Sequence, residues 1–260
     1  MGRKDYLFII SHMRSNSSLL SHILGSHPEI SGHAEMHQSY FEELGLLELR
    51  SKVYFERGRQ VRGRFVLDKL LHNYAQISRE MLQRRGIKFI FLLREPEQTI
   101  KSTLKMGGEL TRKGIIGGHE QWFNDPKAVS DYYCERLRAI GEMATIVREN
   151  GLYIPSETII TDTDRVLGLL TTWLGLGTGL ESKYSIFENT GKHGYGDISE
   201  KIKSGIVVRD KSNYDDISVS PEVLERTEAA YQACRSILAA RCATLESMER
   251  MISTPALEKR

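Results

Sequence analysis

Short runs of consecutive apolar residues alternate along this chain with polar turns and with segments of helical periodicity. The apolar runs lie at Tyr6–Ile10, in "RFVLDK" (64–69), in "IKFIFLLRE" (87–95) and in "GLYIPSETII" (151–160). Runs that are continuous rather than alternating are typical of strands buried on both faces of a parallel sheet. We therefore predict four such strands.

Apolar residues recur at helical spacing between and after these runs. A first helix is predicted from the apolar face of Leu19, Leu20, Ile23 and Leu24, ending at "GSHPEI" (25–30). Another is predicted from Pro96 onward, a longer one over 128–149, and a long closing helix from Ser220 to Met248. Strands alternating with helices indicate an α/β fold with a central parallel sheet flanked by helices. Since the 260 residues contain no linker-like or repeated tract, we expect one domain spanning residues 1–260.

Two segments lack clear periodicity. Residues 106–125 are rich in glycine with few periodic apolar positions, and we interpret them as a mobile loop that contacts an acceptor. Residues 189–208 are polar and basic, and we interpret them as a loop that closes over a ligand.

Charge and cysteine content narrow the class of protein. The 36 Lys and Arg residues nearly balance the 34 Asp and Glu residues, so the net charge of +2 gives no indication of a nucleic-acid or membrane partner. Three cysteines without a CxxC pair favour a reducing compartment. The N-terminal apolar run is far too short for a signal or membrane segment. We expect a cytoplasmic protein.

The stretch "FIISHMRSNSSLLSHIL" places a strand, a turn of small polar residues and a helix close to the N-terminus. A strand–loop–helix offers backbone N–H groups and the positive end of a helix dipole to an anion. Ser15, Ser17 and Ser18 add hydroxyl donors, and Arg14 adds a guanidinium suited to a tetrahedral oxyanion. A simple helix cap is the alternative interpretation. The chain lacks the Walker A pattern GxxxxGKS/T, which disfavours hydrolysis of ATP or GTP.

A second cationic position follows the third apolar run, in "FLLREPEQTIKS". Arg94 stands at the carboxyl end of the predicted strand, and Ser102 follows two helical turns later. Ligands of parallel α/β sheets bind at the carboxyl ends of the strands, so we expect this pair to bind a second phosphate. An exposed arginine and a solvent-facing serine are the alternative.

Taken in order, these motifs resemble the sulfotransferases that use 3′-phosphoadenosine 5′-phosphosulfate (PAPS). Arg14-Ser15-Asn16-Ser17-Ser18 is similar to the family loop R/K-x-G-T/S-T/S that holds the 5′-phosphosulfate, with Asn16 in place of the glycine. Arg94 and Ser102 match the family pair that binds the 3′-phosphate. "HPEI" followed by Glu35 is similar to another family element, and Asp68-Lys69 matches a D-K-x-P element that here lacks the proline.

The resemblance implies roles for several residues. Arg14 and Lys69 would stabilise the leaving phosphate, and Glu35, or alternatively His37, would take the proton of the acceptor. Lys192 and Lys201, in the basic segment, would help bind PAPS. The resemblance also implies that no metal is required, and that Asn16 adopts the backbone conformation of a glycine.

We therefore expect a sulfotransferase that moves a sulfuryl group from PAPS to a hydroxyl or amine of a small-molecule acceptor, a natural product among them, leaving adenosine 3′,5′-bisphosphate (PAP). One alternative is a P-loop-like small-molecule kinase that uses ATP and magnesium; it predicts a Walker lysine and magnesium ligands, and neither is evident. A second alternative is a nucleotide-binding module without catalysis, which the combination of Arg14, Lys69 and Glu35 disfavours.

Overall fold

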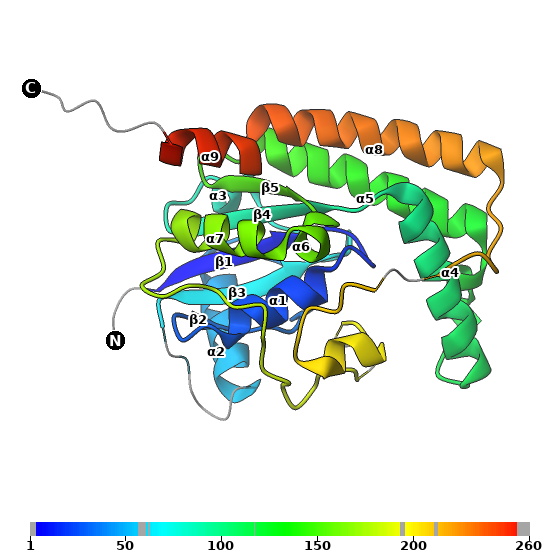
Figure 1. Cartoon of the computed structure of the whole chain (residues 1–260), viewed down its shortest axis with the longest axis horizontal. Coiled ribbons are helices and arrows are strands. Elements are labelled where there is room, and N and C mark those ends of the chain that lie inside the picture. The colour runs from blue at the N-terminus through cyan, green and yellow to red at the C-terminus, as the bar shows by residue number, and fades with distance from the viewer. Residues whose placement is uncertain are drawn as a thin grey trace, which may run out of the picture.

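The chain folds around a six-stranded sheet in which every pair of neighbouring strands is parallel (Figure 1). The computed structural model describes residues 4–56, 61, 63–116, 118–192, 196–210 and 213–253. The strand order is β2-β3-β1-β4-β5-β6. The strands are β1 Asp5–Ile10, β2 Ile30–Ser31, β3 Phe65–Leu70, β4 Ile87–Leu93, β5 Gly151–Pro155 and β6 Ala243–Thr244. The predicted α/β fold with a central parallel sheet is confirmed.

Helices connect and cover the strands. They are α1 Ser17–Ser26, α2 Glu43–Glu56, α3 Arg79–Leu82, α4 Pro96–Arg112, α5 Pro126–Ile146, α6 Thr158–Thr161, α7 Thr163–Leu174, α8 Pro221–Arg241 and α9 Leu245–Ser253, with short 3₁₀ helices η1 Gly118–Asn124 and η2 Glu200–Ser204. No helix in this described part of the chain is long and apolar enough to cross a membrane.

Each face of the sheet is buried under its own layer of helices, which explains why the strands are continuously apolar. In β1, Phe8 and Ile10 pack into a core shared with α2, α4, α5 and α8. The intervening Leu7 and Ile9 pack into a second core with α1, α6, α7 and α9. Figure 1 shows the long helices α5 and α8 side by side on one face and α1, α6 and α7 on the other. Successive side chains of a strand point to opposite faces, so a strand covered on both sides carries apolar residues throughout.

The predicted loop over residues 106–125 is wrong in its first part. Helix α4 continues to Arg112, and η1 forms from Gly118 to Asn124. Gly107 permits this arrangement, because a Cβ atom there would lie only 2.6 Å from the carbonyl oxygen of Phe123. The glycine thus serves close packing of α4 against η1, where the composition had indicated a mobile loop.

The predicted closing helix over residues 220–248 is also interrupted. Helix α8 ends at Arg241, and Cys242 has an extended backbone. Ala243 and Thr244 then pair with β5 as the edge strand β6 before α9 begins. Apolar spacing alone did not reveal this break, because the residues on both sides of it keep multiples of the helical repeat.

The predicted loop over residues 189–208 contains the short helix η2 and otherwise lacks regular structure among its described residues. Its residues 193–195 lie outside the described part of the chain.

Candidate active site

The turn between β1 and α1 contains two residues other than glycine with a left-handed backbone conformation. Arg14 has φ of 62° and Asn16 has φ of 61°, both in the left-handed region. The glycine-like conformation expected of Asn16 is therefore confirmed, and Arg14 shares it. Helix α1 begins directly afterwards at Ser17, so its first N–H groups face the carboxyl edge of the sheet.

Ser15 holds this turn from the inside. Its fully buried hydroxyl donates to the carbonyl of His12 over 2.7 Å and lies 2.6 Å from the hydroxyl of Ser11. The hydroxyl that the sequence suggested as an anion donor is thus engaged in the turn itself. Asn16 fixes the other side, since its amide donates to the carbonyl of Ser156 over 3.2 Å.

Replacing Asn16 should separate the backbone effect from the loss of this hydrogen bond. Both Asn16→Gly and Asn16→Ala lose the bond to Ser156, but a left-handed backbone costs alanine about 1–2 kcal/mol and costs glycine little. We expect the glycine variant to unfold at a higher urea concentration than the alanine variant. Equal midpoints for the two would contradict a strained turn.

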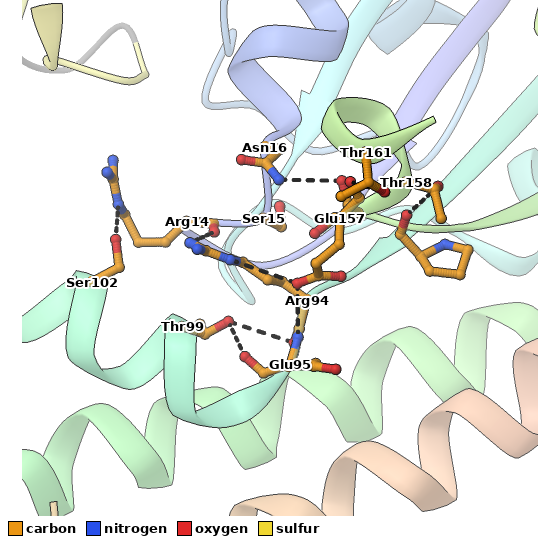
Figure 2. Close-up of polar contacts among 12 residues, drawn as sticks. Arg14, Ser15, Asn16, Arg94, Glu95, Thr99, Ser102, Glu157, Thr158 and Thr161 are labelled. Carbon is orange, nitrogen blue, oxygen red and sulfur yellow. Dashed lines mark hydrogen bonds and ion pairs between the residues drawn. The ribbon is translucent and has the colours of Figure 1, made fainter. Parts of the chain in front are cut away.

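Two arginines and Ser102 come together beside the turn (Figure 2). Arg14 Nε donates to Ser102 Oγ over 3.0 Å, which joins the turn to α4. Arg94, at the end of β4, donates from Nη1 to the carbonyl of Arg14 over 2.9 Å. Arg94 and Ser102, the pair predicted to bind a second phosphate, thus both contact Arg14, and it is Arg14 that contacts Ser102.

Glu157 joins this group, and sequence reasoning did not single it out. One of its carboxylate oxygens lies 3.7 Å from Arg94 Nε, beyond hydrogen-bonding distance, so the buried Nε has no acceptor among the described residues. Glu157 precedes α6 and also accepts from the backbone N–H of Glu95 over 3.3 Å. Burial raises the pKa of this carboxyl, with a partial offset from the nearby Arg94 charge.

The segment around Gly196 reaches over the turn. Asp197 accepts from Arg14 Nη1 over 3.0 Å, and the Asp197 backbone N–H donates to Ser18 Oγ over 3.0 Å. A Cβ atom on Gly196, whose φ is +115°, would lie 2.6 Å from Ser18 Oγ and 3.1 Å from Lys69 Nζ. Burial alone would raise the pKa of Asp197, but Arg14 and Ser199 outweigh it and lower that pKa.

The two lysines predicted on this segment donate hydrogen bonds to residues close to them in the sequence. Lys192 is exposed and donates to the side chain of Asn189 over 3.2 Å, and Lys201 donates to the carbonyl of Asp210 over 2.8 Å. Asp197 makes hydrogen bonds with the turn, and Gly196 leaves room for the close approach of this segment. Their role was missed because neither residue type signals an anion site.

Lys69 lies between the turn and a cluster of acidic groups. It is fully buried in β3, beside Ile9 of β1, and its Nζ lies 3.4 Å from Ser18 Oγ. Burial lowers its pKa, while the nearby carboxylates of Glu35 and Asp68 favour the charged form. The hydroxyl of Tyr40 donates a hydrogen bond to the buried carboxylate of Asp68, the residue that precedes Lys69.

Glu35 is a buried carboxylate flanked by two histidines. Its Oε1 lies 3.7 Å from Nδ1 of His37 and 3.8 Å from Nε2 of His72, and this oxygen has no hydrogen-bond partner in the part of the chain that the structure describes. Burial raises the pKa of Glu35, partly offset by Lys69 and His37. The structure therefore brings together Lys69 and both predicted candidate bases.

His72 is a member of this cluster that sequence reasoning missed. Burial lowers its pKa to about 4, so its imidazole is neutral near pH 7. Its ring is stacked on Tyr74 and lies 2.5 Å from the hydroxyl of Tyr132. The available signal was its position two residues beyond β3, at the carboxyl edge where ligands bind.

A buried arginine fixes the carboxyl ends of the central strands. Arg136, on α5, donates to the carbonyls of Ser11 over 2.8 Å, Leu70 over 2.5 Å and His72 over 3.4 Å. Burial lowers its pKa to about 10, so the guanidinium remains charged near pH 7. Because it joins the loops that carry the turn and His72, it positions both halves of the site.

His12 should make the stability of this protein depend on pH. Its Nε2 accepts the backbone N–H of Arg94, and burial lowers its pKa to about 3. The unfolded chain takes up this proton near pH 6.5, so the free energy of unfolding should fall as the pH drops below that value. For this group the slope is about 1 kcal/mol per pH unit. Burial also lowers the pKa values of His22 and His72, so His12→Asn should reduce the slope of the free energy of unfolding against pH between pH 6.5 and 5 without removing it. An unchanged slope would contradict this assignment.

Comparison with known proteins agrees with this architecture. One similar solved structure is a sulfotransferase domain from the curacin biosynthetic pathway, with a TM-score of 0.60 and 16% identity, covering 90% of this chain and 99% of that one. Another is mouse sulfotransferase SULT7A1 complexed with PAP, with a TM-score of 0.56 and 12% identity, covering 91% of this chain and 89% of that one. No protein-family model and no curated protein matches the sequence. The chain therefore has the sulfotransferase fold.

Proposed function

We propose that this protein transfers a sulfuryl group from PAPS to a hydroxyl or amine of a small-molecule acceptor. One observation carries the proposal: the fully buried Lys69 lies 3.4 Å from Oγ of Ser18, near the start of α1, and interacts electrostatically with the buried carboxylate of Glu35. A cation in this position would act both on an anion held at the turn and on a candidate base. The sulfotransferase fold and the PAP complex of one structural neighbour support the choice of donor.

The hydrogen-bond donors of the site form two groups, which suits a ligand that carries two separate anionic groups. The start of α1, with Ser17 and Ser18, would hold the 5′-phosphosulfate, and Arg94 with Ser102 would hold the 3′-phosphate. The buried Nε of Arg94, for which no described residue supplies an acceptor, is a donor available for such a group. Charge-assisted hydrogen bonds from arginine suit phosphate oxygens geometrically. Lys192 and Lys201 stay predicted contributors from the segment that follows Asn189.

PAPS would supply the activated sulfuryl group, and the residues of this chain would act on the charges around it. Sulfuryl transfer resembles phosphoryl transfer, in which positioning and electrostatic stabilisation provide most of the catalysis. Arg14 and Lys69 would stabilise negative charge on the departing phosphate. Glu35 would accept the acceptor's proton, and its raised pKa brings it nearer the range useful to a general base.

His37 is the alternative base, and His72 adds another group at the same carboxylate. His37 is 43% exposed in its side chain, whereas Glu35 is almost fully buried beside Lys69. We assign the proton transfer to Glu35, since Lys69 links it to the turn. The histidines would orient the carboxylate and the acceptor. Natural-product hydroxyls and amines are the acceptors we propose, in line with the curacin-pathway neighbour.

A transfer assay tests this proposal. The protein is incubated with PAPS and a panel of alcohols, phenols and amines, and mass spectrometry detects acceptors that gain one sulfuryl group together with release of PAP. We expect at least one sulfated product that is absent with ATP and magnesium. Phosphorylated products from ATP, with no PAP release from PAPS, would favour the kinase alternative.

A further inference from the structure

The exposed face of α2 carries a row of large apolar side chains. Leu44 is 55% exposed, Leu47 54%, Tyr54 37% and Phe55 70%, and Phe41 just before the helix is 59% exposed. Together they account for five of the eleven large apolar side chains that are exposed in the described part of the chain. Contiguous exposed patches of this kind mark interaction sites more often than single exposed residues do.

The geometry of the helix places these residues on one side. At about 100° per residue, Leu44, Leu47, Tyr54 and Phe55 fall within one arc of about 100°. The buried residues Leu46, Leu49 and Val53 lie on the opposite side, where they pack into the core of the sheet. The helix therefore has two apolar faces, and the fold covers one of them.

The charged residues beside this face are placed so that they could pair with the opposite charges on a second copy of the same surface. Glu48 and Lys52 lie on the same flank of α2, with the acidic residue nearer the N-terminus. A two-fold axis perpendicular to the helix, near residue 50, would bring that flank of one copy against the same flank of another, running in the opposite direction. Glu48 would then face Lys52 of the second copy, and the reverse contact would form as well.

The apolar residues give the same position for the axis. An axis near residue 50 brings Leu44 opposite Phe55 of the second copy and Leu47 opposite Tyr54. Ser51, a small residue on the same face, lies close to the axis and allows the two helices to approach. Lys52 also donates to the carbonyl of Met36 over 3.1 Å, and an ammonium group retains further donors for Glu48. A single two-fold axis near residue 50 thus pairs the exposed apolar residues with one another and also pairs the opposite charges.

We propose that α2 forms an isologous, antiparallel homodimer interface with α2 of a second copy of this chain. The five apolar side chains expose on the order of 500 Å², taking each full side-chain surface as roughly 200 Å². Two copies would bury on the order of 1,000 Å² from these side chains, which meets the lower limit of about 1,000 Å² for a biological interface. This proposal does not depend on the proposed function.

Sedimentation equilibrium of the full chain between micromolar and 100 micromolar concentrations tests the proposal. We expect a dimer for the wild type and a dimer dissociation constant at least a hundredfold higher for Leu47→Glu. Ile252→Glu, at another exposed apolar position, is the matched control and should leave the dimer intact. Circular dichroism confirms that each variant is folded.

A charge exchange tests the antiparallel geometry itself. Glu48→Lys brings lysine against Lys52 of the second copy and should weaken the dimer roughly tenfold, since about 1.4 kcal/mol corresponds to that factor. The double variant Glu48→Lys with Lys52→Glu reverses both charges and should restore the affinity to within threefold. If Leu47→Glu fails to fold, this series decides in its place. A wild type that stays monomeric, a Leu47→Glu variant that stays dimeric, or no rescue in the double variant would overturn the proposal.

Discussion

Lys69→Met is expected to lower kcat for sulfuryl transfer by a factor between about a hundred and a thousand, the range typical for loss of one preorganised stabilising group. Methionine has a similar length and is apolar, so it fits the fully buried position of Lys69 in β3. The loss would arise because the cation between Ser18 and Glu35 is removed and the charge on the departing phosphate is left without it. Steady-state rates with saturating PAPS measure the effect.

Lys88→Met is the matched control for this substitution. Lys88 is also a strand lysine that is partly buried, on β4, which β1 separates from β3, but it donates to the carbonyl of Trp173 over 2.5 Å and lies 4.2 Å from the centre of the Trp173 ring. We expect its kcat to stay within threefold of the wild type. If Lys69→Met and Lys88→Met lose activity equally while both remain folded, the catalytic assignment of Lys69 is wrong.

Glu35→Gln should lower kcat by about a hundred- to ten-thousandfold, the usual contribution of a general base. Glutamine keeps the shape of the side chain and cannot accept the proton. In the wild type, kcat should rise with pH through the raised pKa of Glu35 and then level off, because the ionised carboxylate is the active form. The variant should lose this rising limb.

Binding measurements and two histidine variants separate proton transfer from donor binding. The dissociation constant for PAP should stay within threefold of the wild type in Glu35→Gln, and kcat in His37→Asn and His72→Asn should fall less than tenfold. A thousandfold loss in His37→Asn with little effect of Glu35→Gln would transfer the role of base to His37. Weakened PAP binding in Glu35→Gln would instead show that the carboxylate acts by holding Lys69.

The main strands could be predicted because burial on both sheet faces leaves a continuous apolar signature. The segments Tyr6–Ile10 and 87–95 correspond to β1 and β4, which lie side by side at the centre of the sheet. Helix α2 gave no comparable signal. Its residues are apolar on both sides, so no single face stands out from the pattern. The short strands β2 and β6 were missed for a different reason, since two residues are too few to show a period.

The site residues that could be predicted are cationic residues at the carboxyl ends of predicted strands. Lys69 lies in β3, Arg94 directly follows β4, and Arg14 lies in the turn that follows β1. The parallel sheet brings the carboxyl ends of these three strands to one edge. Contacts between distant segments could not be predicted in this way. The pairing of Arg14 with Ser102 and the contact of Asp197 with the turn depend on side-chain directions and loop paths that residue spacing does not encode.

Isothermal titration of PAP against the wild type and Arg94→Ala tests the central claim most directly, with ATP and magnesium titrated in parallel. We predict micromolar binding of PAP to the wild type, a loss of at least a hundredfold in Arg94→Ala, and no comparable binding of ATP with magnesium. Tight binding of ATP and magnesium that does not depend on Arg94, with no binding of PAP, would contradict the account.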